Sequence, residues 1–219
     1  MALPTKPQYP VNGKYKKDFK ITSDFGFRIH PITKAKKHHN GTDLWGSKEP
    51  LLIEAFYDGV VIAKSYNGAG FGNYVVIRHT IGGKKYTSLY AHMKSASKLK
   101  VRQKVEAGTV VGIMGTTGAS TGKHLHFEIG KGSTHPFISG GDGKRYVDPM
   151  KFISTLIKKW EGEKELAEAH VEAGQATPAD SIAQPMPAHS VPASDVPAPA
   201  PAPNPVAKPA PAKKPAPKK

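Results

Sequence analysis

The sequence contains no cysteine among its 219 residues. This absence excludes a thiol nucleophile, a disulfide framework and any zinc site built on thiolates. Long apolar runs are missing too, so no segment offers the ~20 consecutive apolar residues that span a bilayer. The first twenty residues hold three prolines and no apolar core of a secretory signal. We therefore expect a protein made in the cytoplasm without a signal peptide, which reaches any outside target only after release.

Proline is scarce in the first three quarters of the chain, and glycine is scarce in the last quarter. Thirteen of the 20 prolines lie between Pro178 and Pro217, whereas 20 of the 22 glycines lie between Gly13 and Gly143. A segment rich in Pro and Ala cannot bury a core. The predicted organisation is an N-terminal extension (1–20), a folded domain (21–160), a polar helical extension (161–174) and a disordered, basic-ended tail (175–219).

Negative charge is in short supply. The chain carries 32 Lys and Arg against 17 Asp and Glu, a formal net charge of +15. Residues 1–160 account for 26 of the basic and 10 of the acidic side chains, so the excess lies in the folded part. Such a surface attracts polyanions, either nucleic acid or an anionic cell wall. Charge alone does not choose between them.

What is present is a series of short β-type runs separated by glycine turns. This punctuation predicts a mainly β fold with antiparallel sheets. One C-terminal amphipathic helix is expected after Asp148, which can cap it, and Pro149, which suits its first turn. The predicted strands are LLIEAF (51–56), GVVIAKSY (59–66), FGNYVVIRHT (71–80), KKYTSLYAHM (84–93), TVVGIMG (109–115) and KHLHFEIG (123–130).

Three histidine motifs occur on or beside these runs. His124 and His126 are two apart, so on a strand they share one face; alone, such a pair is more often two solvated histidines than a site. His39 and Asp43 are four apart, with Gly41 between them to let the backbone turn. Two imidazoles and a carboxylate leave a tetrahedral zinc open for water, as catalytic zinc requires. His92 adds a third imidazole.

Together these motifs resemble the lysostaphin/LytM-type zinc endopeptidases, which cut peptide cross-links of bacterial peptidoglycan. The resemblance runs from about residue 21 to residue 153 and implies antiparallel sheets that form a substrate groove with zinc on its floor. The stretches that carry it are TSDFGFRIHP (22–31), HNGTD (39–43), YDGVVIA (57–63), GFGNYVVIRH (70–79), SLYAHM (88–93), GTTGASTGKHLHFEI (115–129) and VDPMKFI (147–153).

The resemblance also implies roles for single residues. His39, Asp43 and His126 would bind one Zn²⁺ per chain, and His92 and His124 would be the catalytic histidines. His39 rather than His38 is the expected ligand, because only His39 has the matching spacing to Asp43. His30 and His79 lie where the family often has a histidine without a catalytic role, and both are read as structural or groove-lining.

The expected function is therefore a zinc-dependent endopeptidase acting on peptidoglycan, in the setting of a phage endolysin or a virion-associated lysin. Anionic wall polymers are expected to contact the basic core and tail, and we expect a monomer with no specific nucleic-acid partner. Two alternatives stay open. One is a non-catalytic wall-binding or regulatory module of the same fold, and the other is a polyanion-binding protein that has no use for the ordered histidines.

Overall fold

A computed structural model describes residues 5–29, 36–47, 49–137 and 143–172. The chain divides into two units, residues 1–179 and 180–219, and the second lies outside the described residues. The tail predicted for 175–219 is therefore also outside them, as is His30. Within the described part, no helix combines the length and the apolar composition that crossing a bilayer requires.

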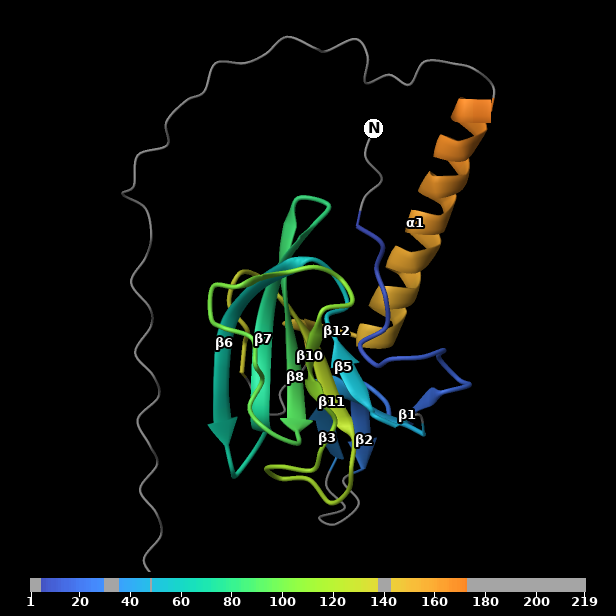
Figure 1. Cartoon of the computed structure of the whole chain (residues 1–219). Helices are drawn as coiled ribbons and strands as arrows, with labels where there is room; N and C mark the ends of the chain where they lie inside the picture. Colours follow the sequence, from blue (N-terminus) through green and yellow to red (C-terminus); the bar gives the residue numbers. More distant parts are fainter. Residues whose placement is uncertain (1–4, 30–35, 48, 138–142, 173–219) are drawn as a thin grey trace, which may run out of the picture. The chain divides into compact units, whose positions relative to one another are not determined.

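Eight strands form one sheet in which every neighbouring pair is antiparallel. Their bounds are β1 Phe19–Ser23, β4 Gly41–Gly46, β6 Gly59–Asn67, β7 Gly72–Ile81, β8 Lys84–Met93, β9 Lys104–Val105, β11 Leu125–Lys131 and β12 Tyr146–Val147. The order across the sheet is β1–β4–β11–β8–β7–β6–β9, and β12 also pairs with β11 (Figure 1). The predicted mainly β, antiparallel fold is confirmed.

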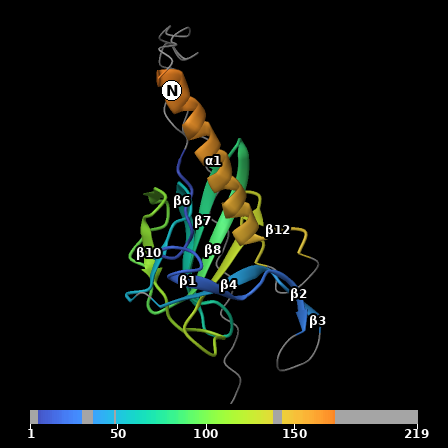
Figure 2. The same cartoon turned by 90° about the vertical axis from the view of Figure 1, so that its right-hand side faces the viewer.

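Two two-stranded sheets accompany the large one. β5 (Leu52–Glu54) pairs with β10 (Val110–Ile113), and β2 (Gly26–Ile29) pairs with β3 (Lys36–His39). Figure 2 shows β2 and β3 on the side of the molecule opposite β10. Since β3 ends at His39 and β4 begins at Gly41, this second pair brings a histidine next to the start of β4 in the large sheet.

Strand β11 separates the core from the site because its side chains alternate between the two faces. Leu125, Phe127 and Ile129 are fully buried in the main hydrophobic core. His126 and Glu128 point to the other face, where their direct partners on β8 are Ala91 and Leu89. The strand therefore anchors the site through every second residue.

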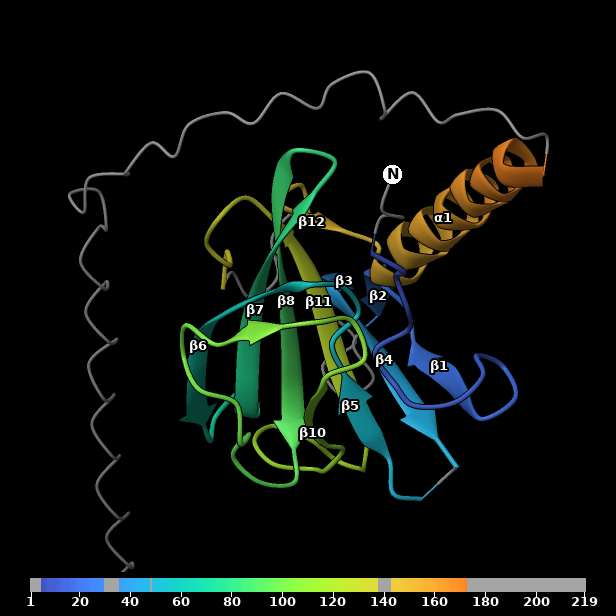
Figure 3. The same cartoon turned by 45° about the horizontal axis from the view of Figure 1, so that its top comes forward.

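One helix, α1, packs its first turns against the hydrophobic core. It runs from Pro149 to Glu172, and Asp148 Oδ1 accepts hydrogen bonds from the backbone N–H groups of Met150 and Lys151 at 3.1 and 3.2 Å. The predicted C-terminal helix and its cap are confirmed. The helix contacts β4 and β11 and lies away from β6 (Figures 1 and 3).

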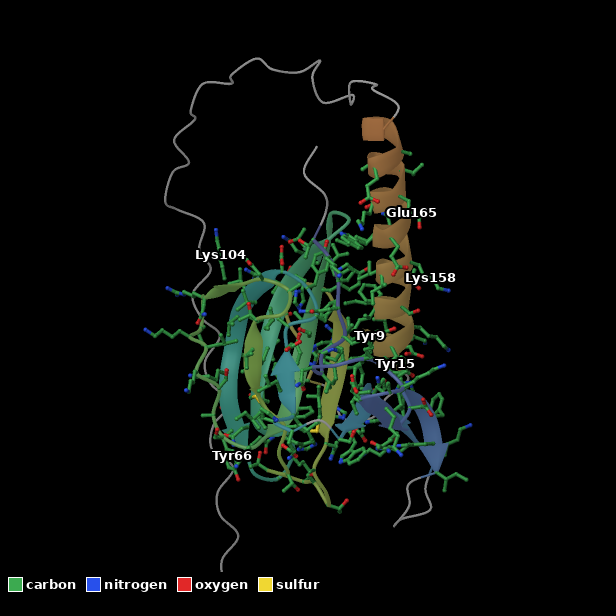
Figure 4. The ribbon with its side chains drawn as sticks, turned by 45° about the vertical axis from the view of Figure 1, so that its right-hand side comes forward. Tyr9, Tyr15, Tyr66, Lys104, Lys158 and Glu165 are labelled. Carbon is green, nitrogen blue, oxygen red and sulfur yellow. The ribbon has the colours of Figure 1, made fainter. Side chains whose placement is uncertain are left out.

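The segment before β1 packs onto this framework. Val11 and Phe19 belong to the hydrophobic core, although the sequence places them in an N-terminal extension. Tyr9 and Tyr15 lie with their ring centroids 5.1 Å apart, near the foot of α1 (Figure 4). The boundary at residue 20 stays a prediction.

Candidate metal centre

Three side chains from three segments bring one donor atom each to a common point. Asp43 Oδ1 lies 2.8 Å from His126 Nδ1 and 3.2 Å from His39 Nε2, and the two ring nitrogens are 3.1 Å apart. The register places Asp43 of β4 directly opposite His126 of β11. For Zn²⁺ held at ~2.0–2.1 Å, neighbouring tetrahedral ligands are about 3.3 Å apart. The triangle therefore has the dimensions of a metal site.

The outer hydrogen bonds of the two histidines leave their lone pairs facing this point. His39 Nδ1 lies 2.8 Å from the carbonyl oxygen of Asp24, and His126 Nε2 lies 2.9 Å from Glu128 Oε1. A carbonyl or a carboxylate accepts only, so these outer nitrogens carry the protons. Two nitrogen lone pairs and a carboxylate oxygen then converge, which is stable only with a cation between them. The donor set fits Zn²⁺.

The pKa values of His126 and Asp43 also indicate that the site favours a positive charge. Burial alone would lower the pKa of His126, but hydrogen bonds with Asp43 and Glu128 raise it to about 9. Burial opposes ionisation of Asp43 as well, yet hydrogen bonds from His126 and His39 hold its pKa well below the usual range. In the metal-free protein a proton thus takes the place that a metal cation fits.

His92 and His124 lie beside this centre with their ring centroids 4.7 Å apart. His92 Nδ1 donates to the carbonyl oxygen of Thr117 at 2.8 Å, and His124 Nδ1 donates to that of Gly122 at 2.8 Å. Both Nε2 atoms are therefore left with their lone pairs, and that of His124 lies 3.8 Å from Asp43 Oδ1. The two rings are available for proton transfer.

Burial also changes the pKa of His92. Its side chain is largely buried, and this burial lowers its pKa to about 4, so the ring is neutral at pH 7. Its backbone has φ 57°, in the left-handed region that residues other than glycine rarely adopt. Such strain is typical of residues whose position is fixed by function.

Of two polar residues near the triangle, Arg28 lies close to Asp43 and His38 makes its contacts elsewhere. Arg28 Nη1 lies 4.0 Å from Asp43 Oδ2, the carboxylate oxygen outside the triangle. His38 instead pairs its Nδ1 with Asn40 Oδ1 at 2.8 Å and lies edge-on to the ring of Phe27. The geometry supports choosing His39 over His38.

His79 is buried and hydrogen-bonded outside the candidate site, and its structural role stays a prediction. Its Nδ1 donates to the carbonyl oxygen of Asp58 at 2.8 Å, and its Nε2 accepts from the Ser88 hydroxyl at 2.7 Å. Burial lowers the pKa of His79 to about 4.

The structure thus brings all five predicted residues together, and their roles stay a proposal. The expectation that Gly41 lets the backbone turn between His39 and Asp43 was wrong, because the φ of Gly41 is outside the left-handed region. A Cβ at Gly41 would lie 2.5 Å from the carbonyl oxygen of Phe127 and 2.9 Å from both the His126 ring and Glu128, so Gly41 serves close packing rather than a turn.

Sequence reasoning missed Glu128 and His135. Glu128 had a signal, since it shares the strand face of His126 two residues later. His135 had none, because it follows β11 in irregular structure.

A model of peptidase family M23 matches residues 37–149, which span the whole site. The chain belongs to peptidase family M23. This M23 chain is 40% identical over 109 residues to the DD-carboxypeptidase/endopeptidase Mpg of Neisseria meningitidis serogroup B, covering 50% of this chain and 24% of the relative. It is 40% identical over 125 residues to the peptidoglycan DD-endopeptidase ShyA of Vibrio cholerae serotype O1, covering 56% of this chain and 26% of the relative.

Among solved structures, the M23 chain is similar to the catalytic domain of the antimicrobial peptidase lysostaphin from Staphylococcus simulans. The identity is 26% and the TM-score 0.49, with 62% of this chain and 92% of that chain covered. The chain spans about a quarter of the length of the two curated relatives. Family membership supports a hydrolase and confirms the resemblance expected from the motifs.

Proposed function

We propose that this chain is a zinc-dependent endopeptidase that hydrolyses peptide cross-links of bacterial peptidoglycan. The observation that carries the proposal is the convergence of His39, Asp43 and His126 donors beside two further histidines with free Nε2 atoms. The relatives described as peptidoglycan DD-endopeptidase and DD-carboxypeptidase/endopeptidase support the same substrate.

The residues of this chain divide the chemistry between binding and proton transfer. His39, Asp43 and His126 would hold the zinc, which when bound supplies positive charge that polarises a carbonyl and acidifies water. His92 and His124 share the proton transfers: one Nε2 takes a proton from the water that attacks the amide carbonyl carbon. The protonated ring then gives this proton to the amine nitrogen as the C–N bond breaks. The carbonyls of Thr117 and Gly122 keep both Nδ1 protons in place, so each ring works through Nε2.

Digestion of purified sacculi with mass spectrometry of the products tests the proposal. Sacculi of several cell-wall chemotypes are treated with wild type, with wild type plus a chelator, and with His124→Ala. New amino termini within the cross-links are expected for wild type without chelator, and are expected to be absent with chelator and with His124→Ala. The buried His79→Gln is the matched control and is expected to cut as wild type does, because His79 lies outside the site.

Intact sacculi across all chemotypes, despite bound zinc, would contradict the endopeptidase and favour the non-catalytic wall-binding module. The products also name the bond that is cut. The phage setting and the contacts with anionic wall polymers stay predictions.

A further inference from the structure

A second buried histidine lies behind the metal centre and is joined to it by one carboxylate. Glu128 Oε1 is 2.9 Å from His126 Nε2, and its other oxygen, Oε2, is 2.7 Å from His135 Nε2. His135 Nδ1 is in turn 3.1 Å from the Thr87 hydroxyl. Glu128 is 3% exposed and His135 5% exposed, so water does not compete for these bonds.

The carboxylate of Glu128 fixes the direction of the two hydrogen bonds that it makes. The carboxylate of Glu128 accepts from both histidines, so each donates its Nε2–H. In a neutral His135 ring, Nδ1 accepts from the Thr87 hydroxyl. The Glu128 carboxylate thus links the two histidines, and the Thr87 hydroxyl holds the far side of the His135 ring.

His126 differs from the other site histidines in the group that accepts the hydrogen bond from its outer nitrogen. His39, His92 and His124 each donate from their outer nitrogen to a backbone carbonyl oxygen. The backbone itself holds that oxygen in place. His126 depends on a side chain with several rotatable bonds. A fixed Glu128 is therefore needed to fix the ring of His126.

The packing of Gly41 shows how closely this pair is enclosed. Gly41 on β4 is the direct partner of Glu128 on β11. A Cβ at this position would lie 2.9 Å from Glu128 Cγ and 2.9 Å from His126 Cε1. Both side chains therefore fill the space that a larger residue on β4 would take.

We propose that Glu128 and His135 are positioning residues of the metal centre. His135 fixes the carboxylate of Glu128, and Glu128 keeps His126 in the tautomer and orientation that turn Nδ1 toward Asp43. The inference rests on the proposed zinc site and adds to it two residues that bind neither metal nor substrate. Partners of this kind are worth about 10–100-fold in metal affinity.

Zinc affinity, measured by competition with a chromophoric chelator, tests the inference without any use of enzyme activity. Glu128→Leu removes the acceptor and is expected to weaken zinc binding by about 10–100-fold. Glu128→Gln keeps an acceptor oxygen for His126 and is expected to lose much less. His135→Phe keeps a ring of similar size but no donor, and is expected to weaken binding, whereas His135→Gln restores a donor and much of the affinity.

Val61→Ala is the matched control for general destabilisation. Val61 is fully buried on β6, three strands away from β11 across the same sheet. It is expected to lower the free energy of unfolding while leaving zinc affinity unchanged. Urea unfolding of each metal-free variant shows whether a weaker site merely follows a weaker fold.

A spectroscopic readout reports on His126 itself. In zinc-loaded wild type, the Nε2 proton of His126 is expected to give a slowly exchanging, downfield imidazole NMR signal, because it is hydrogen-bonded and buried. This signal is expected to disappear in Glu128→Leu and to shift in His135→Phe, but to stay unchanged in Val61→Ala.

Two outcomes are distinguishable. Wild-type zinc affinity in both Glu128→Leu and His135→Phe, or losses that the glutamine variants do not lessen, would overturn this inference and leave the proposed function intact. A wild-type protein that binds no zinc would overturn the proposed function, and with it the inference.

Discussion

At the scale of the residue, neighbouring histidines on one strand differ in the atom that faces Asp43. His126 presents Nδ1 and His124 presents Nε2, at 2.8 and 3.8 Å from Asp43 Oδ1. Only the shorter contact completes the triangle with His39. A metal role and a proton-transfer role are therefore separable by single substitutions.

We expect His126→Ala to lose the bound zinc and His124→Ala to keep it. The reason is that His126 supplies one of three donors, whereas His124 supplies none. The measurement is zinc per chain after dialysis, with rate of cross-link cleavage measured beside it. His124→Ala should retain one equivalent while its rate falls by about 10²–10⁴. Loss of zinc in both variants would contradict the assigned roles.

A second residue-scale prediction concerns His79 and acid stability. Its folded pKa of about 4 lies below the usual value of 6.5, because burial disfavours the charged ring. The unfolded chain therefore binds this proton more readily, and stability is lost as pH falls from 6.5 through 4. The cost at pH 5, relative to pH 7.5, is about 2 kcal/mol.

The measurement is the free energy of urea unfolding at the two pH values, in chelator, for wild type and His79→Gln. Glutamine cannot titrate, so the pH dependence should flatten by that amount. An unchanged slope in the variant would show that other groups govern acid unfolding.

At the scale of the element, the loop that follows β10 positions both catalytic candidates. The carbonyls of Thr117 and Gly122 hold His92 and His124, and the loop itself packs on the turn before β7. A Cβ at Gly118 would lie 2.2 Å from the backbone nitrogen of Gly72. The loop can approach this turn only because Gly118 lacks a side chain.

Gly118→Ala is therefore expected to lower both stability and cleavage rate. Gly82→Ala is the matched control, because Gly82 also has a positive φ, +54° against +78°, but open space around its Cα. Backbone strain alone costs ~1–2 kcal/mol at either site. Urea unfolding should show a larger loss for Gly118→Ala, and only that variant should cut more slowly. Equal effects on both measurements would contradict a positioning role for the loop.

How far the sequence predicts the molecule differs from element to element. Strands with clear alternation or apolar runs, such as β7, β8 and β11, were predictable, as was α1 with its cap. β9 and β12 have two residues each, too few for any period to show. His135 was unpredictable for a related reason: only the folded chain brings an irregular segment against Glu128.

At the scale of the whole molecule, the excess of positive charge bears on the proposed contact with the bacterial wall. The formal net charge is +15, and walls that carry phosphate or carboxylate polymers would attract such a protein. Basic side chains project from distant parts of the described surface, among them Lys104 on β9 and Lys158 on α1 (Figure 4).

We expect cleavage of sacculi to slow as NaCl rises from 50 to 500 mM, because salt screens attraction to the wall. Cleavage of a small, soluble, uncharged cross-linked peptide is the control and should change little, since the site chemistry is unaffected. Equal salt dependence with both substrates would argue against wall attraction.

The left-handed backbone of His92 sets its proposed role in proton transfer against the stability of the fold. At φ 57°, any side chain with a Cβ is strained by ~1–2 kcal/mol, and glycine is not. His92→Gly should consequently unfold at a higher urea concentration than His92→Ala, although glycine normally weakens a strand. The proposed proton-transfer role of His92 would therefore be maintained at a cost in folding free energy, which a chain with glycine at this position does not carry.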